Sequence, residues 1–213
     1  MPYSVKWEGE SASFSDADDF IAAAVDGGDV LFVLGKADPA SCRGAGFAAV
    51  AVELGSECLE FYEGADEGDP TNIVGFARWR LGQNDPSQLV EVVKGARTSD
   101  DALAAVTTIL EAAGFTVAVS ADRAGRIVDR LIRPQFNLAL QSVDEDLATA
   151  EDLDLCLKLG LGYRRGLLAP LLAGGLDSHH DITEALFDVY GQPQYAPARR
   201  AVVAKKRAET ARG

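Results

Sequence analysis

The hydrophobic pattern of the chain changes its period near Asp122. From there on, apolar residues recur at three- and four-residue steps, which is the period of an amphipathic helix. Before that point, apolar residues lie in short runs that end at Gly, Pro, Asp or Asn, which is typical of strands. The sequence therefore predicts an α/β layer over residues 1–119 and an all-α domain over residues 120–213.

Short apolar runs mark the strands expected in the first part. The principal ones span residues 30–34, 47–54, 58–62, 73–79 and 89–93. A capping sequence at residues 98–101, Thr-Ser-Asp-Asp, predicts a helix that runs to about Ala113, and Gly114 is expected to end it.

The strongest helical pattern covers roughly 25 residues after Asp122. Its apolar arc is so wide that packing against a single surface would leave part of it exposed to water. We expect one side to pack within the chain's own domain and the other to pack on a second subunit, giving a homodimer. The residues expected at this dimer interface are Ile127, Leu131, Phe136 and Leu140. Shorter helices are expected at residues 149–159, 167–173, 181–190 and 198–208.

The net charge of −13 disfavours binding to nucleic acid, which needs a positive surface to replace the counterions of the phosphates. Residues 198–213 are an exception, with six basic residues against Glu209 alone. This basic end could hold an anionic ligand or the acidic surface of a partner, but a solvated tail is the favoured interpretation. No run has the length of a membrane span and the first residues have no signal-peptide pattern, so no membrane association is expected.

The cysteines and histidines indicate neither disulfides nor a metal site. Three cysteines without C-x-x-C spacing are typical of a reducing, cytoplasmic setting. The only two histidines, His179 and His180, are adjacent, and adjacent helical positions do not converge on one ion. One of them could form a base–orienter pair with Asp177 or Asp181. An exposed position at a helix start, titrating near pH 6.5, is the favoured interpretation.

Several motifs from about residue 87 onward resemble one known family. Residues 88–95 read Q-L-V-E-V-V-K-G, residues 122–131 read D-R-A-G-R-I-V-D-R-L, residues 148–154 read A-T-A-E-D-L-D, and residues 159–162 read L-G-L-G. In this order they resemble the last strand of the nucleotide domain and the C-terminal helical domain of 3-hydroxyacyl-CoA dehydrogenases. Residues 1–86 match only loosely.

This resemblance implies a reduced Rossmann-like layer followed by a dimerising helical domain of the 6-phosphogluconate-dehydrogenase-C-terminal-like type. It also implies NAD as the cofactor of an active member, and an acyl-CoA ligand. Arg164 and Arg165 lie where the family has a proline-containing turn, and they are candidate contacts for a CoA phosphate. A solvated turn is the equally weighted alternative for these two arginines.

The expected dinucleotide cradle is degenerate. Residues 44–49 satisfy G-x-G-x-x-A as a string, but such a fingerprint must follow a strand and open a helix. Residues 48–54 alternate like a strand instead. A glycine loop that enters a strand is therefore the favoured interpretation, and no cofactor site is assigned.

The expected catalytic residues are also replaced. By the resemblance, Ala77 stands at the position of the family's catalytic His, and Glu91 stands where a Glu would orient that His. Asp129 replaces the Asn that binds the substrate oxygen, and a carboxylate cannot donate a hydrogen bond there unless it is protonated. An ion pair with Arg126 or Arg130 is expected for Asp129, and Glu91 is as readily a solvated strand residue.

Three hypotheses for function follow. The favoured one is a dimeric homologue without its own NAD site and base, which binds acyl-CoA or acts as an accessory to a full-length dehydrogenase in fatty-acid metabolism. The second is a diverged but active oxidoreductase that uses Asp129 or Glu91 as the base. The third is a structural interaction protein that makes contact through its basic tail.

Overall fold

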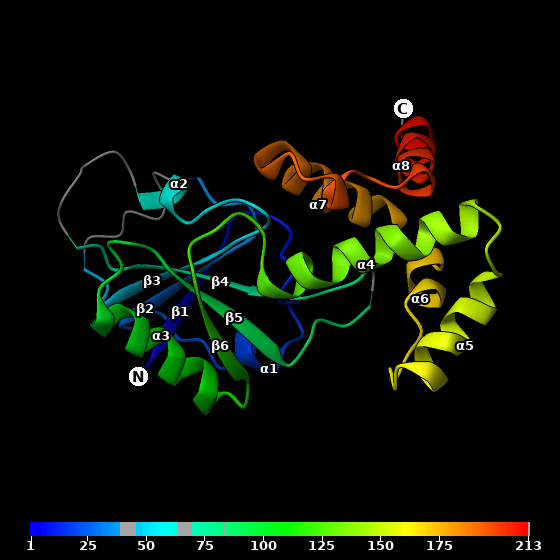
Figure 1. Cartoon of the computed structure of the whole chain (residues 1–213). Coiled ribbons are helices and arrows are strands. Elements are labelled where there is room, and N and C mark those ends of the chain that lie inside the picture. The colour runs from blue at the N-terminus through cyan, green and yellow to red at the C-terminus, as the bar shows by residue number, and fades with distance from the viewer. Residues whose placement is uncertain (39–45, 64–69, 83, 213) are drawn as a thin grey trace. The chain divides into compact units, whose positions relative to one another are not determined.

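The computed structural model describes residues 1–38, 46–63, 70–82 and 84–212, and it divides the chain into two compact units (Figure 1). The α/β unit consists of residues 1–80 and 86–127, and the helical unit of residues 81–85 and 128–213. The main chain thus passes between units at Ile127, later than the predicted end of the first domain at residue 119. The short segment 81–85 belongs to the helical unit, although it comes from the first half of the chain.

The α/β unit contains one sheet of six strands in chain order. The strands are β1 (Tyr3–Trp7), β2 (Val30–Leu34), β3 (Ala49–Glu53), β4 (Ile73–Arg78), β5 (Leu89–Lys94) and β6 (Thr116–Ala121). All neighbouring pairs are parallel except β4 and β5, which are antiparallel.

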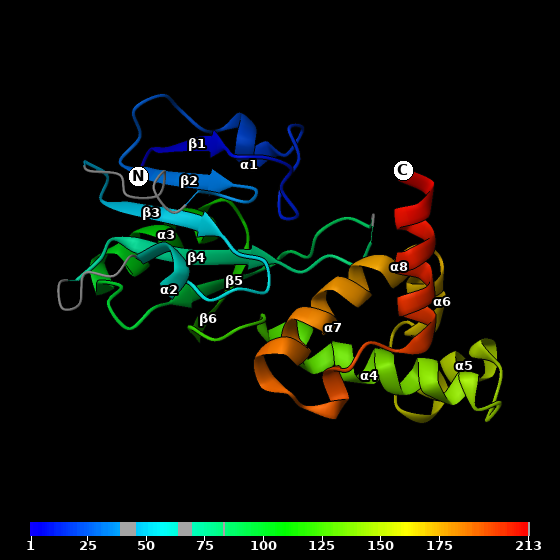
Figure 2. The same cartoon turned by 90° about the horizontal axis from the view of Figure 1, so that it is seen from above.

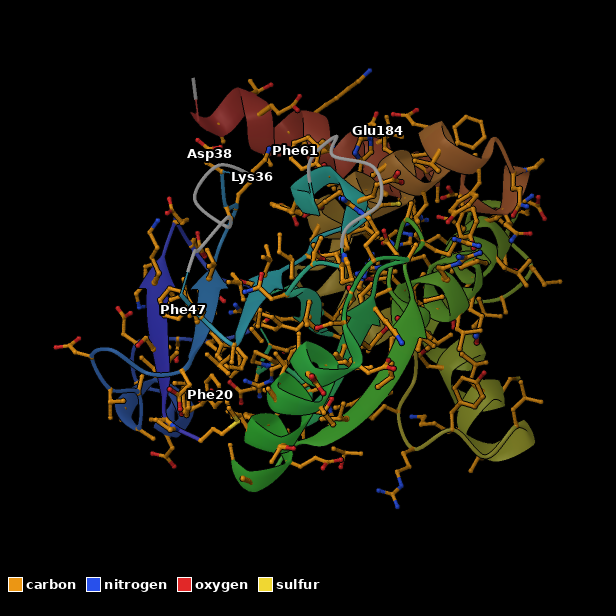
Figure 3. All side chains as sticks on the ribbon, turned by 90° about the vertical axis from the view of Figure 1, so that its left-hand side faces the viewer. Phe20, Lys36, Asp38, Phe47, Phe61 and Glu184 are labelled. Carbon is orange, nitrogen blue, oxygen red and sulfur yellow. The ribbon has the colours of Figure 1, made fainter. Side chains whose placement is uncertain are left out.

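The central strands are buried on both faces, which explains their nearly continuous apolar sequences. On one face, Phe32 and Phe76 pack with Phe20 of α1 (Asp19–Ala22), which Figure 3 labels, and with α3 (Asp100–Ala112). The other face packs against Leu59 and Tyr62. Two covering layers of this kind are the usual setting of a parallel sheet.

The ends of α3 lie where capping residues predicted them. The Ser99 side chain accepts a hydrogen bond from the Ala102 amide, and Gly114 follows the helix with a φ of +89°. The strand predicted at residues 58–62 is wrong, because this region contains helix α2 (Glu60–Glu63). The spacing of its buried residues, Leu59 and Tyr62, is three, which fits a helical turn rather than an alternating strand.

The helical unit contains five helices and one short 3₁₀ helix among its described residues. They are α4 (Ile127–Asp144), α5 (Ala150–Gly160), α6 (Leu168–Leu172), α7 (Leu176–Tyr190), the 3₁₀ helix Pro193–Tyr195 and α8 (Arg199–Arg212). α5 packs on α6, and α7 packs on α8, as Figure 2 shows from a second direction. The predicted fold class, an α/β layer followed by an all-α domain, is confirmed. No helix within the described ranges has the length and apolarity needed to cross a bilayer.

Candidate functional site

The glycine string of residues 44–49 does not open a helix in the part that the structure describes. Gly44 and Ala45 lie outside the described residues, Gly46 has a φ of +112°, and Ala49 is the first residue of β3. A dinucleotide fingerprint needs a helix N-terminus after the glycines to hold the pyrophosphate. In addition, the six described strands keep chain order, so they contain no switch point of the kind where dinucleotides bind.

Ala77 and Glu91 face each other across the antiparallel pair of β4 and β5. Both are buried, with exposed fractions of 6% and 1%. Directly opposed residues have side chains close enough to interact. A histidine at residue 77 would therefore lie beside Glu91, but the methyl group of Ala77 offers no base.

The Glu91 carboxylate binds the start of α4. It accepts a short hydrogen bond from the Ile127 amide, which belongs to the first residue of that helix. A carboxylate at this place satisfies an amide that has no partner within the helix and complements the positive end of the helix dipole. Glu91 is thus not the solvated strand residue that one interpretation of the sequence held.

Asp129 forms its ion pair with an arginine that the sequence analysis did not consider. Its carboxylate lies 2.7 Å from Nε of Arg133, four residues further along α4. The expected partners are engaged elsewhere: Arg126 donates to the carbonyl oxygens of Glu57 and Arg123, and Arg130 stacks on the Tyr190 ring at 4.8 Å. The predicted pairing of Asp129 with Arg126 or Arg130 is therefore wrong.

Arg133 is completely buried and approaches a histidine. Its Nη1 lies 3.4 Å from Nδ1 of His179, which is also completely buried. Since a guanidinium only donates, Nδ1 must accept, and the ring proton then resides on Nε2. Nε2 lies 2.9 Å from the side-chain oxygen of Asn137, which accepts that proton.

Asn137 connects this polar cluster to the chain ahead of α8. Its Nδ2 donates to the carbonyl oxygens of Gln194 and Ala196, and its Oδ1 also accepts from the Ala198 amide. Asp129, Arg133, His179 and Asn137 form one chain of polar contacts inside the helical unit, which we call the buried polar cluster. These contacts fix α4 against α7 and against the residues that precede α8.

The comparisons with known proteins agree with this architecture. A family model described as "3-hydroxyacyl-CoA dehydrogenase, C-terminal domain" matches residues 125–213. By its helical part, the chain is similar to the C-terminal domain of 3-hydroxyacyl-CoA dehydrogenases.

Curated relatives are similar over about half of this chain. A probable 3-hydroxybutyryl-CoA dehydrogenase of Deinococcus radiodurans is 36% identical over 111 residues, which are 52% of this chain and 40% of that protein. One of Bacillus subtilis is 34% identical over 110 residues, which are 52% of this chain and 38% of that protein. The chain thus matches less than half the length of these relatives.

A solved structure shares the fold over more of the chain. The crystal structure of (S)-3-hydroxybutyryl-CoA dehydrogenase from Ralstonia eutropha superposes with a TM-score of 0.69 and 23% identity. The match covers 82% of this chain and 64% of that chain. It therefore extends beyond the helical unit, although sequence identity is low.

The two arginines expected to meet a CoA phosphate, Arg164 and Arg165, are exposed in the turn between α5 and α6. Asp154 fixes this turn, because its carboxylate accepts from the amides of Leu168 and Ala169 at 2.9 Å each. Gly166 touches that carboxylate so closely that any Cβ would overlap it. The Asp154 carboxylate thus fixes the end of the turn that carries the two arginines.

The residues expected at the dimer interface lie on two different faces of α4. Phe136 and Leu140 are buried inside the helical unit, with exposed fractions of 2% and 0%, so they are core residues and not contacts for a second subunit. Ile127 and Leu131 are exposed, at 39% and 65%. Leu138, also 65% exposed, extends this uncovered row, seven residues after Leu131.

His179 is not the exposed, titrating residue that the sequence favoured. Burial lowers its pKa from 6.5 to about 3, and the positive charge of Arg133 adds to this effect. The physical reason is that α7 begins at Leu176, after Gly175, rather than near residue 181. His179 therefore lies inside the helix, on the face that packs against α4.

Acid should destabilise the helical unit through His179. The unfolded chain binds a proton below about pH 6.5, whereas the folded unit does so only near pH 3. The free energy of unfolding should therefore fall as the pH falls through this window, by up to about 1.4 kcal/mol per pH unit. Urea unfolding followed by circular dichroism between about pH 7 and pH 4 measures this slope. His179→Gln keeps one donor and one acceptor and should remove most of the slope; an unchanged slope would assign it to other groups.

Proposed function

We propose that this chain is a non-catalytic, dimeric homologue of 3-hydroxyacyl-CoA dehydrogenases that binds acyl-CoA, or assists a full-length dehydrogenase, without transferring hydride itself. The observation that carries the proposal is the buried pair of Ala77 and Glu91. The position opposite Glu91 has no titratable group, and the carboxylate itself holds the first amide of α4.

Neither histidine supports an alternative base. His179 is fully buried, and its low pKa leaves the ring neutral with both nitrogens engaged. His180 is 8% exposed, and its Nδ1 lies 3.3 Å from the Asp181 carboxylate on the same helix. A general base must reach the proton that it removes, and these side chains are held inside the helical unit.

The substitution at Asp129 also argues against ordinary dehydrogenase chemistry. Its carboxylate is paired with buried Arg133, so it is committed to the buried polar cluster. An asparagine at this position would offer an amide N–H to a substrate oxygen, whereas a carboxylate offers only acceptors. Ala49, the last residue of the glycine string, begins strand β3 and not a helix, and this argues against dinucleotide binding at the string.

The names of the curated relatives support the second hypothesis, a diverged but active oxidoreductase. In that case Glu91 or Asp129 would have to serve as the base. Both carboxylates already accept hydrogen bonds from other groups, Glu91 from the Ile127 amide and Asp129 from Arg133. We therefore rank this hypothesis second.

Ligand-dependent melting and turnover distinguish the hypotheses. Acetoacetyl-CoA should raise the melting temperature of the purified chain, whereas NADH should change neither the melting temperature nor its own fluorescence on mixing. Oxidation of NADH by acetoacetyl-CoA should not exceed the buffer rate. Turnover that Glu91→Gln abolishes would establish the second hypothesis, and no response to either ligand would favour the structural interaction protein.

Substitutions in the turn between α5 and α6 test where acyl-CoA binds, and two lysines elsewhere provide the matched control. Arg164→Gln with Arg165→Gln should remove most of the shift caused by acetoacetyl-CoA, since guanidinium groups are strong partners of phosphates. Lys158→Gln with Lys206→Gln removes the same charge from other exposed positions and should leave the shift nearly unchanged. Equal losses in both double variants would mean that net charge, and not this turn, attracts the ligand.

A further inference from the structure

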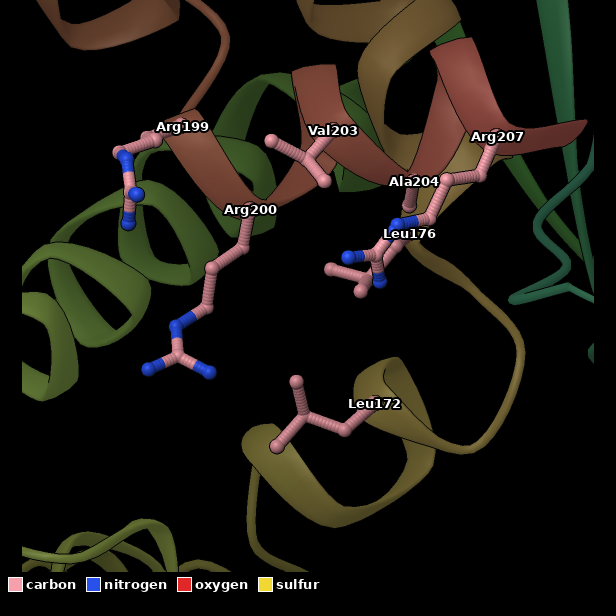
Figure 4. Close-up of a pocket in the computed structure, with 7 residues that line it drawn as sticks. All are labelled: Leu172, Leu176, Arg199, Arg200, Val203, Ala204 and Arg207. Atoms are coloured by element: carbon pink, nitrogen blue, oxygen red, sulfur yellow. The ribbon is translucent and has the colours of Figure 1, made fainter.

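The helical unit contains a pocket of about 330 Å³ that is not part of the buried polar cluster. Figure 4 shows its lining side chains, which come from the end of α6, the start of α7 and one side of α8. They are Leu172, Leu176, Arg199, Arg200, Val203, Ala204 and Arg207. The volume is at the lower end of the range for small-molecule sites.

The lining of α8 combines two kinds of side chain on one face. Arg200, Ala204 and Arg207 are separated by four and three residues, so they share a side of the helix. The two arginines lie about 10 Å apart along the axis at 1.5 Å per residue, with Val203 and Ala204 between them. The pocket thus has positive ends and an apolar middle.

The apolar part of the pocket is exposed in the structure. Leu172 is 39% and Val203 is 37% exposed, and both line the pocket (Figure 4). Exposed apolar side chains beside one another are favourable contacts for an apolar ligand group, since its burial removes their surface from water.

Two of the arginines that line the pocket lie where a positive charge is electrostatically unfavourable without a bound anion. Arg199 and Arg200 occupy the first turn of α8, and the positive end of a helix dipole repels cations there. Asp144 accepts from Nε of Arg200 at 2.6 Å, which orients that guanidinium and occupies one of its five donors. No acidic residue lines the pocket, and Arg207 is exposed. An anion in the pocket would offset the charge of these arginines.

The buried polar cluster positions this first turn. Asn137 binds the carbonyl oxygens of Gln194 and Ala196 and the amide of Ala198, directly ahead of Arg199. The main chain that carries Arg199 and Arg200 is therefore held in place by hydrogen bonds and is not a frayed end. This corrects the favoured interpretation of residues 198–213 as a solvated end.

We infer that this pocket binds an organic anion, in which a carboxylate or phosphate head is attached to a short apolar chain. The head contacts Arg207 at one end of the pocket, and the chain lies on Leu172, Leu176 and Val203. Guanidinium groups bind both kinds of head with paired hydrogen bonds. The site is separate from the acyl-CoA contact proposed for Arg164 and Arg165.

Calorimetric titration with matched ligands tests each part of this inference. Hexanoate and hexyl phosphate should bind, whereas hexanol, which has no charge, and inorganic phosphate, which has no chain, should bind at least about tenfold more weakly, because each lacks one set of contacts. Equal affinity for inorganic phosphate and hexyl phosphate would overturn the proposed contact between the ligand's chain and the apolar residues of the pocket. Tighter binding of hexanoate than of hexyl phosphate identifies a carboxylate ligand, and the reverse order a phosphate ligand.

The neighbouring basic residues on α8 provide matched variants. Arg207→Gln should weaken the binding of hexyl phosphate by about tenfold, since it removes a charged hydrogen bond. Lys206→Gln removes the same charge one residue away, outside the pocket lining, and should change affinity less than about twofold. Equal effects of the two variants would overturn the site in favour of general attraction by the basic tail.

Two further outcomes separate this site from the proposed function and from subunit contact. Loss of the acetoacetyl-CoA melting shift in Arg207→Gln, with Arg164 and Arg165 intact, would place acyl-CoA in this pocket and overturn the turn contact instead. A halved molecular mass of Arg207→Gln in light scattering would show that a second copy of the chain fills the pocket, which would overturn the small-ligand proposal.

Discussion

Asp129→Asn should lower the free energy of unfolding of the helical unit by about 3–5 kcal/mol, because it leaves the charge of Arg133 buried without its counterion. Arg133 has no exposed surface, and Asp129 is the carboxylate that pairs with it. The nearby His179 cannot compensate, since its ring is neutral. Within the described residues, Nη2 of Arg133 has no hydrogen-bond partner, so the guanidinium is already incompletely satisfied.

Urea unfolding followed by two signals measures this effect. Circular dichroism at 222 nm reports mainly on the helical unit, whereas the only tryptophans, Trp7 and Trp79, belong to the α/β unit. The midpoint of the dichroism transition should fall markedly, with a smaller change in tryptophan fluorescence. Asp188→Asn makes the same chemical change at an exposed residue of α7 and should alter stability by less than about 0.5 kcal/mol.

A double variant tests whether charge is the cause. Asp129→Leu with Arg133→Met removes both charges and should recover most of the stability, because apolar replacement of a complete buried pair is often neutral. A loss under about 1 kcal/mol in Asp129→Asn would contradict the importance of the pair.

Leu131→Asp with Leu138→Asp should convert the proposed dimer into a folded monomer. The buried face of α4 carries Arg133, Phe136 and Leu140, whereas Leu131 and Leu138 form an uncovered row on another face. Burial of an exposed leucine contributes roughly 1.5–3 kcal/mol, and a carboxylate in the same interface would be desolvated without a partner. Two aspartates on each copy should therefore shift the dissociation constant by several orders of magnitude.

Light scattering after gel filtration measures the outcome against the monomer mass of 22.5 kDa. Val119→Asp with Val189→Asp places the same charges at two other exposed apolar residues and should leave the dimer intact. Phe136→Asp should instead unfold the helical unit, because Phe136 is core. A monomeric wild-type protein at about 10 μM would contradict the proposed dimer, since an obligate dimer persists well below that concentration.

Helix-capping residues and the hydrophobic period made several elements of this fold predictable from the sequence. Ser99 and Thr149 cap helices as their residue types and positions indicate, and the wide apolar arc after Asp122 corresponds to the two faces of α4. The resemblance placed Ala77 at the position of the catalytic His and Glu91 at that of its orienting Glu, and the strand register places the two residues opposite each other. These features depend on a few neighbouring residues or on a pattern with a regular period.

The buried polar cluster was missed because its members are charged or polar and lie far apart in sequence. An arginine followed by a proline is usually a solvated residue, yet Arg133 has no exposed surface. The spacing of four between Asp129 and Arg133 was the one available signal for their pair. The contacts of Arg133 with His179, and of Asn137 with residues 194–198, join segments more than 40 residues apart, and no local pattern indicates them.

The use of Glu91 as the acceptor for α4 limits what a substitution at Ala77 can achieve. The carboxylate already stabilises the start of a helix. Ala77→His would introduce an imidazole that competes with the Ile127 amide for the same oxygen atoms. This one substitution therefore does not by itself create an independent His–Glu pair, because α4 would first need another acceptor for its first amide. Any redesign of this strand pair for base chemistry has to begin at the start of α4.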